Sequence, residues 1–235
     1  MLEPDEGFWS PNSIDLIRAF LRKGIPDDGV LAHKRAFISN IAYNLQYLEF
    51  LNHLLTEKQL HVTVRTQSQK SFVIGCMSVI EAILWYVLRK NRMHKIEEWE
   101  EIEEFQTPSF RNGDDEFRIR NTILKKRNEP IEGEMALDSM IKKVESKKLL
   151  GIDHQVYRDL NYLRKLRNRV HIHAVQHDRD TDWYSFNDQE VKLSKKVLFS
   201  VLSSDLFEPE EKHCAIIQYM KVQEPIDQLA DSIPF

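Results

Sequence analysis

The sequence predicts an all-α protein, an up-and-down helical bundle in a single domain. Gly and Pro are scarce, at seven and eight of 235 residues, and Leu, Ile, Lys and Glu are frequent, a composition that favours helices. Apolar residues recur at helical spacing along most of the chain, and no Gly-, Ser- or Pro-rich linker interrupts them. The single domain, 1–235, is expected to comprise a helical extension over 1–66, a core over 67–205, and a C-terminal helix and tail over 206–235.

The N-terminal third contains two amphipathic patterns. A Ser-Pro pair opens a predicted helix over 10–23, and Gly24 ends it. A Pro-Asp-Asp-Gly turn over 26–29 leads to a second helix over 30–58. The segment 60–66 alternates weakly, and either a short strand or a helix fits it.

The most apolar stretch is FVIGCMSVIEAILWYVL, residues 72–88. It is slightly short for a membrane span and has Glu81 at its middle. A buried helix over 68–91 at the centre of the core is the better interpretation, and we expect no membrane partner.

Two patterns follow that helix. Residues 94–105, HKIEEWEEIEEF, contain six Glu, with Ile96, Trp99 and Ile102 spaced by three, and predict an acidic helix. After an exposed loop over 106–115, residues 117–127 alternate apolar and polar side chains, which is typical of a strand. A short β-hairpin inserted near 115–130 therefore fits the bundle.

The C-terminal half again indicates helices. Asp153 is a suitable N-cap for the helix that follows it, and the tail after Pro225 is expected to be loose. Helices are predicted over 134–150, 154–174, 187–204 and 209–221, with an irregular polar segment over 176–187.

Whole-chain properties limit the classes of function. The net charge of −4 does not indicate nucleic-acid binding by the molecule as a whole, so any basic surface must be local. Cys76 and Cys214 are too few for a disulfide framework or a Cys-based zinc site, which suits a reducing cytosol. The N-terminal MLEPDEGFW lacks the pattern of a signal peptide, and we expect a cytoplasmic protein.

The segment LRKLRNRVHIH, residues 163–173, concentrates cationic side chains. On a helical wheel Arg164, Arg167, Asn168 and His171 fall within about 100° of one another, and His173 lies nearly opposite Arg164. Apolar residues form the adjoining face, which we expect to be buried: Val156, Leu160, Leu163, Leu166 and Val170.

Two Arg at the margin of a core need an anionic partner. Glu81 is one candidate and a phosphate is the other. Arg matches phosphate oxygens with a planar fork, and His titrates near neutral pH. Those are the groups that phosphodiester cleavage without a metal requires: His as general acid or base, and Arg to stabilise the charge that develops on the phosphate. The usual alternative is a solvated helix face with a structural salt bridge.

The surrounding sequence is basic. Residues 141–175 contain nine Lys or Arg and three Asp or Glu. Such a patch attracts polyanions, although many solvent-exposed helices carry a similar excess of basic residues.

Two stretches, SVIEAILWYVL and LRNRVHIH, resemble the HEPN superfamily over roughly residues 68–205. Its members are helical bundles, usually dimers, found in bacterial defence and toxin–antitoxin systems. Their marker is an Arg, often followed by Asn, then four to six residues and a His. Catalytic members are metal-independent endoribonucleases whose single site is formed by two motifs across the dimer interface; others bind nucleotides or proteins without cleavage.

The resemblance implies a role for each site residue. Arg167 would bind the scissile phosphate, His171 would be the acid/base, and Asn168 would orient the pair. Arg164 and Arg169 would contact substrate, and Glu81 would hold an Arg in place. The spacing departs from the pattern because only three residues separate Arg167 from His171, whereas Arg167 to His173 leaves five and Arg164 to His171 leaves six. His173 replaces His171 if the helix unwinds at Val170.

The favoured interpretation is therefore a homodimeric, cofactor-free RNA endonuclease that leaves a 2′,3′-cyclic phosphate, with an antitoxin as a candidate partner. Two alternatives stay open. One is a non-catalytic HEPN module that binds a nucleotide or a protein. The other is a metal site at His171, His173 and His177, which lacks any H-E-x-x-H pattern; we expect no bound metal.

Overall fold

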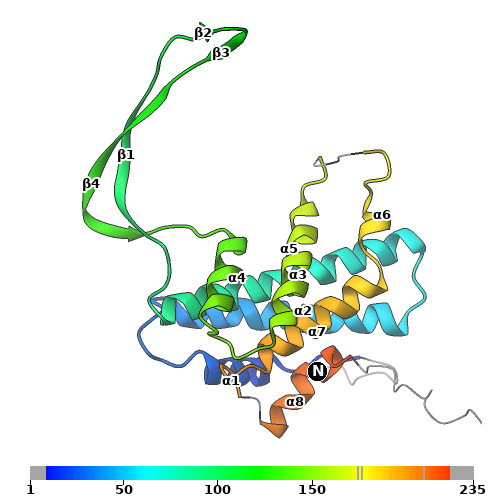
Figure 1. Ribbon diagram of the computed structural model, residues 1–235. Coiled ribbons are helices and arrows are strands. Elements are labelled where there is room, and N and C mark those ends of the chain that lie inside the picture. Colours follow the sequence, from blue (N-terminus) through cyan, green and yellow to red (C-terminus); the bar gives the residue numbers. More distant parts are fainter. Residues whose placement is uncertain (1–8, 174, 176, 209, 223–235) are drawn as a thin grey trace, which may run out of the picture.

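The molecule is a helical body from which a long β-hairpin projects (Figure 1). A computed structural model of the chain describes residues 9–173, 175, 177–208 and 210–222. Within them the helices are α1 (Ile14–Gly24), α2 (Lys34–Glu57), α3 (Val62–Lys90), α4 (Leu137–Ser146), α5 (His154–Arg167), α6 (Asp182–Ser185), α7 (Asp188–Leu202) and α8 (Glu211–Ile217). The strands are β1 (Ile96–Gln106), β2 (Phe110–Asn112), β3 (Asp115–Phe117) and β4 (Arg120–Glu132).

The body is built around α3. This helix contacts α2, α4, α5 and α7, and its largest core side chains, among them Phe72 and Ile80, are fully buried. The segment 60–66, which fitted either a strand or a helix, contributes the first turns of α3. Buried residues from Ile17 in α1 to Met220 near the end of the described chain form one cluster.

Helix α3 is long and apolar enough to cross a membrane, and it is the one such helix among the described residues. However, 61% of its most apolar 18-residue stretch is buried inside the fold. A core helix of a soluble protein behaves in this way, because the apolar side chains meet other helices instead of lipid.

The all-α prediction is wrong. Strands β1 and β4 pair antiparallel over their full length, and β2 pairs with β3 at the tip. The chain is therefore a mixed structure of helices and antiparallel strands. We call residues 95–133, which comprise both ladders, the arm. The strand expected over 117–127 is present as β4, whereas the acidic helix expected over 94–105 is strand β1.

The error at β1 has a physical cause. Ile96, Trp99 and Ile102 are spaced by three, which fits a helix. In the structure the register between β1 and β4 shifts twice: one extra residue lies in β1 between Glu101 and Glu103, and at the shift between Glu97 and Trp99 the extra residues lie in β4. Bulges break the two-residue alternation on which strand prediction depends. Strand pairing also places acidic side chains opposite basic ones, since Glu100 lies 3.2 Å from Arg127 and 3.8 Å from Lys125.

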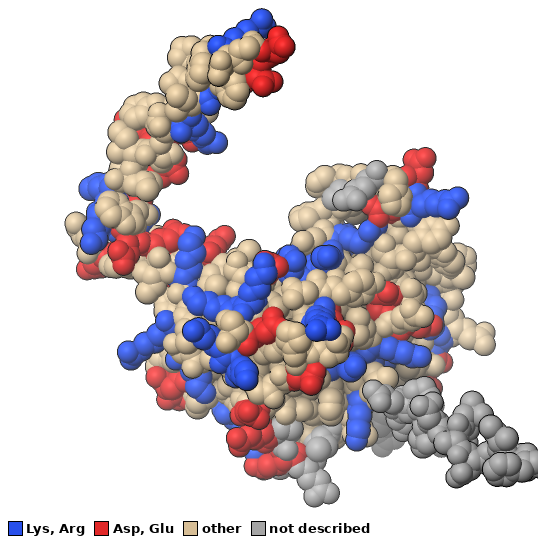
Figure 2. Space-filling view, in the orientation of Figure 1, with Lys and Arg blue, Asp and Glu red and all other residues tan. Residues whose placement is uncertain are grey.

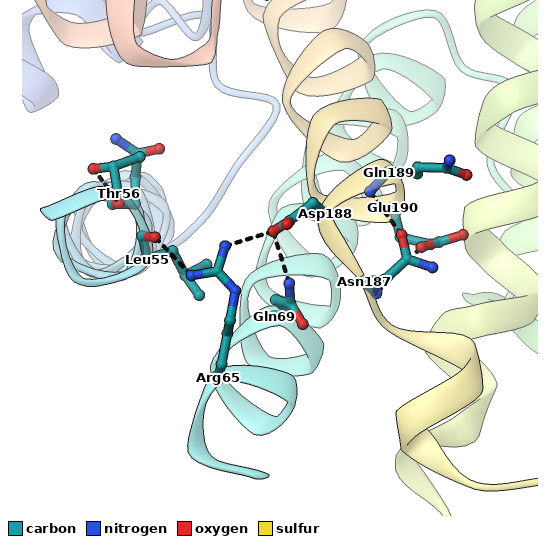
Figure 3. A network of polar contacts seen from close by, with 9 residues as sticks. Leu55, Thr56, Arg65, Gln69, Asn187, Asp188, Gln189 and Glu190 are labelled. Carbon is teal, nitrogen blue, oxygen red and sulfur yellow. Dashed lines mark hydrogen bonds and ion pairs between the residues drawn. The ribbon is translucent and has the colours of Figure 1, made fainter. Parts of the chain in front are cut away.

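The start of α7 is fixed to the start of α3 by a polar network (Figure 3). Asp188 accepts hydrogen bonds from Arg65 at 2.7 Å and from Gln69 at 2.9 Å. Arg65 also donates to the carbonyl of Leu55 at 3.1 Å, which connects α2 to the same point. A capping box formed by Asn187 and Glu190 begins α7 here. The network sets the position at which the preceding loop returns to the body.

Candidate functional site

Helix α5 carries the cationic segment, and it is shorter than the sequence predicts. Asp153 caps its first turn by accepting from the backbone N–H of Gln155 at 2.7 Å. The α-helix ends at Arg167, a 3-10 turn covers Asn168–Val170, and the chain is extended at His171. The expected helix to 174 is therefore wrong at its C-terminal end. Leu166 is the last buried apolar side chain of this segment, so no packing supports further helical turns.

The early end of α5 changes the relation between the two histidines. A helical wheel does not apply beyond Val170, so the placement of His173 opposite the Arg side chains is wrong. Both imidazoles are exposed, and their ring centroids lie 5.9 Å apart with planes at 50°. Either imidazole can therefore reach a substrate bound at the end of α5.

Arg167 is held by the one acidic residue of the apolar helix α3. Its Nη2 lies 2.7 Å from Oε2 of Glu81, and the two side chains are 36% and 28% exposed. This is the contact that the resemblance implies for Glu81. Only Nη2 has a protein partner in the described part of the chain, so Nε and Nη1 can still donate to an anion. The wheel's buried face is present at Val156, Leu160, Leu163 and Leu166, while Val170 is 47% exposed.

Arg164 pairs with α4. Its Nη2 lies 2.9 Å from Oδ1 of Asp138, and the other oxygen of Asp138 lies 2.7 Å from Lys142. The hydrogen bond from Lys142 and the positive charge of Arg164 hold the pKa of Asp138 below its ordinary value. Arg164 Nε is buried without a hydrogen-bond partner among the described atoms. Arg164 therefore connects α5 to α4, and Arg167 is the better placed of the two for a ligand.

The loop after α5 forms a small pocket beside His171. The pocket has a volume of about 220 Å³, and Lys70, Arg169 and Asp182 are among its lining residues. Arg169 pairs with Asp180, and the buried Lys70 on α3 binds both carboxylate oxygens of Asp182, at 2.9 and 3.0 Å. Asn168 is exposed at the start of the 3-10 turn, and its side chain makes no hydrogen bond to another described residue.

A larger cavity lies on the other side of Glu81. Its volume is about 650 Å³, and its walls include Phe37, Trp85 and His94. The rings of Phe37 and Trp85 lie 5.6 Å apart at 43°. His94 Nδ1 is buried and has no hydrogen-bond partner in the described structure. Glu81 thus connects a cavity with aromatic walls to the guanidinium of Arg167.

Carboxylates from other elements offset part of the basic patch. The count of charged residues over 141–175 omits three acids that pair with Arg residues of this segment. They are Glu81, Asp138 and Asp180. The basic side chains that remain without an ion pair within the described residues are Lys143, Lys147, Lys148, Arg158 and Lys165. The positive surface therefore lies on α4 and the outer face of α5.

The three histidines of the metal alternative are not gathered into a metal site. Among the described residues, no three His, Cys, Asp or Glu side chains are placed to share an ion. The geometry fits acid/base chemistry by an imidazole and anion binding by Arg167 better than metal coordination.

Sequence reasoning missed Lys70 and, apart from Glu81, the acids that contact the cationic residues. Lys70 lies just before the apolar run 72–88, and a charged residue there could have been noticed. Its partner Asp182 is 112 residues away, and Asp138 lies on a different helix from Arg164. Local patterns contain no information about such pairings, which depend on how helices pack.

Neither a family model, nor a curated protein, nor a solved structure matches this chain. The likeness to the HEPN superfamily therefore depends on the two quoted stretches of sequence alone.

We expect stability to decline in acid through Asp182. Burial raises the pKa of this carboxyl, but hydrogen bonds from Gln67 and Lys70 outweigh that effect, so its pKa lies below the ordinary value. A carboxyl with a depressed pKa stabilises the fold above its unfolded-state pKa of about 3.9, and this contribution disappears as the pH falls through the lower, folded-state value. Asp182→Asn should therefore lower Tm at pH 7 and flatten the fall in Tm below pH 4, as measured by circular dichroism.

Asp114→Asn is the matched control, because Asp114 is exposed in the turn at the tip of the arm and has no ion pair within the described structure. An equal change in both variants, or a steeper acid dependence in Asp182→Asn, would show that the contact with Lys70 does not stabilise the protein.

Proposed function

We propose that this protein is a cytoplasmic, metal-independent endoribonuclease of HEPN type, acting as a homodimer in bacterial defence or in a toxin–antitoxin pair. The observation that carries the proposal is the pair formed by Arg167 and Glu81, followed four and six residues after Arg167 by two exposed imidazoles. Glu81 fixes the guanidinium through one nitrogen and leaves other N–H donors for a phosphate. His171 and His173 follow within six residues, on a segment that has left the helix.

These groups suffice for the chemistry of 2′-hydroxyl attack. One imidazole takes the proton from the 2′-oxygen, which attacks the phosphorus as the bond to the 5′-oxygen breaks. A protonated imidazole donates to that leaving oxygen. Arg167 stabilises the negative charge on the non-bridging oxygens. The products are a 2′,3′-cyclic phosphate and a 5′-hydroxyl end.

A homodimer supplies two copies of each group. By resemblance, the α5 ends of the two subunits meet and share one substrate site, so that one subunit's imidazole can act as base and the other's as acid. Asn168, exposed at the same end of α5, would orient the phosphate, and Arg164 and Arg169 would support the binding surface.

The cavity behind Glu81 suits the base next to the scissile phosphate. Single-stranded RNA is recognised by stacking on aromatic side chains and by hydrogen bonds to base edges. Phe37 and Trp85 offer the aromatic surface.

A second candidate function is supported by a specific observation. Arg164, Arg167 and Arg169 each pair with a carboxylate of their own subunit. Fully neutralised Arg residues are typical of structural salt bridges, and this favours a non-catalytic module that binds a nucleotide or a partner protein such as an antitoxin.

Incubation of the purified protein with a labelled single-stranded RNA in EDTA separates the two candidates. The nuclease proposal predicts cleavage by the wild type that Mg²⁺ does not stimulate, and its loss in Arg167→Ala. Cleavage at an equal trace level in both proteins would indicate a contaminating nuclease and would leave the binding module as the better account.

A further inference from the structure

The arm is an element without a partner in the monomer. Its paired strands project from the body with nearly every side chain exposed (Figure 1). Strand β1 alone has eleven residues, so at about 3.3 Å per residue it spans ~35 Å. A body of roughly 200 residues has a diameter of about 40 Å, by the scaling of compact domains. The arm is therefore long enough to lie across a second molecule of this size.

The exposed surface of the arm is apolar enough to require a partner. Ten of its large apolar side chains are each 45–55% exposed, among them Trp99, Ile102, Phe105 and Leu124. An isolated two-stranded hairpin is only marginally stable in water. Contact with another surface would bury these side chains and stabilise the ladder.

The charge of the arm excludes a polyanion as its favoured partner. Residues 95–133 contain eleven Asp or Glu and seven Lys or Arg, a net charge of −4, which equals that of the whole chain. Several glutamates of β1 pair with basic residues, but Glu98, Glu101 and Glu103 are exposed and have no ion pair within the described structure. RNA would be repelled by this surface, whereas a basic protein surface would be attracted.

The complementary surface lies on the same chain. We define the α4–α5 basic surface as Lys143, Lys147, Lys148, Arg158 and Lys165, which lack ion pairs within the described residues. In the space-filling view, Lys and Arg gather over α4 and α5, and acidic side chains gather toward the base of the arm (Figure 2). A chain that carries both surfaces is complementary to a copy of itself.

The arm does not reach the α4–α5 basic surface of its own chain. At its base the N–H of Gly133 donates to the carbonyl of Lys95 at 2.9 Å, and Arg89 of α3 pairs with Glu132 at 2.7 Å. These contacts fix its root beside α4, and from there the hairpin runs away from the body (Figure 1).

Symmetric pairing of arm edges is also unfavourable. Two β1 strands placed edge to edge would bring glutamates together, and two β4 strands would bring Lys and Arg together, which is destabilising for cross-strand neighbours. In a two-fold dimer, contact of each arm with the body of the other copy is therefore more favourable than pairing of the two arms.

We propose that in the homodimer the arm of each copy lies across the α4–α5 basic surface of the other copy, which brings the negative charge of Glu98, Glu101 and Glu103 close to its lysines. The inference rests on the homodimer of the proposed function but not on RNA cleavage. Helix α5 also carries Arg167, so the arm of one subunit would lie near the candidate site of the other and hold the two α5 ends in a fixed relation.

A charge-swap experiment tests this arrangement. In the first variant Glu98, Glu101 and Glu103 are changed to Lys; in the second Lys143, Lys147 and Lys165 are changed to Glu. All six side chains lie outside the buried core, so Tm should stay near the wild-type value. Sedimentation velocity should show a wild-type dimer, and each variant alone should have a dimer dissociation constant raised by about tenfold or more, because like charges then face each other.

The mixture of the two variants is the decisive sample. In that heterodimer a basic arm meets an acidic body and an acidic arm meets a basic body, so an equimolar mixture should dimerise as the wild type does. A monomeric wild type, variants that dimerise normally by themselves, or a mixture that stays monomeric would each overturn the proposal. If the wild type dimerises as predicted but does not cleave RNA, the result would instead count against the nuclease function alone.

Discussion

Replacement of His171 by Ala is expected to lower the rate of RNA cleavage by about 10²–10⁴, the contribution of a positioned general acid or base. Replacement of Arg167 by Ala should lower it by about 10²–10³, because the growing charge on the phosphate loses its stabilising donor. Single-turnover cleavage of a labelled RNA in EDTA measures both effects. Arg167→Ala should leave Tm almost unchanged, since a partly exposed ion pair contributes about 0–1 kcal/mol and Glu81 stays hydrated.

Two controls make the result specific. His33→Ala and Arg35→Ala remove an exposed His and an exposed Arg near the start of α2, and neither should change cleavage. His173→Ala decides which imidazole acts, because the two rings lie 5.9 Å apart. If His173→Ala is the more damaging variant, the five-residue spacing from Arg167 defines the motif. If no variant differs from the wild type, the end of α5 is not an active site.

Replacement of Phe72 by Ala is expected to destabilise the protein by about 3–5 kcal/mol, the usual cost of removing a buried aromatic ring. Phe72 is fully buried in α3, and Lys195 of α7 lies over its ring at 5.8 Å. The cavity left behind would weaken the contact between these two helices. Urea denaturation measures the free energy of unfolding, and Tm should fall by roughly 10 °C, given about 2–4 °C per kcal/mol for a chain of this size.

Phe50→Ala makes the same chemical change at a position of α2 that is 41% exposed. It should lower the free energy of unfolding much less than Phe72→Ala does. Comparable stability in the two variants would contradict the placement of α3 at the centre of the core. It would also reopen the interpretation of α3 as a membrane span.

The sequence predicted the parts of the fold that local patterns determine. The apolar run 72–88 indicated a central buried helix, and the spacing of Val156, Leu160 and Leu163 indicated the buried face of α5. Asp153 marked the start of that helix. The cost of placing charges at the margin of a core named Glu81 as one candidate partner for the Arg residues, beside a phosphate, and in the structure Glu81 pairs with Arg167.

The arm could not be predicted in the same way. Strand β1 is stabilised by pairing with β4, and the extra residue between Glu101 and Glu103 interrupts the alternation that would have distinguished it from a helix. Its charge pattern is explained only by the partner strand, because Glu104 pairs with Arg120, sixteen residues further along. The class of the fold therefore depended on a contact between segments that each looked unremarkable alone.

The candidate site shows the same division between local and long-range information. Residue types identified Arg167, Asn168 and His171 as candidates, but the end of α5 at Arg167 depends on where packing stops, after Leu166. The acids that pair with the cationic segment lie on other elements, and no spacing within 163–173 indicates them. Sequence therefore named the candidate residues, and packing determined their geometry.

Cleavage of an oligodeoxynucleotide that contains a single ribonucleotide tests the central claim most directly. We predict that the dimer cuts it in EDTA only 3′ of the ribose, that mass spectrometry finds a 2′,3′-cyclic phosphate on the upstream product, and that Arg167→Ala abolishes the reaction. Cleavage of the all-deoxy strand, dependence on an added metal ion, or a product ending in a 3′-hydroxyl would contradict catalysis by the arginine and imidazoles at the end of α5.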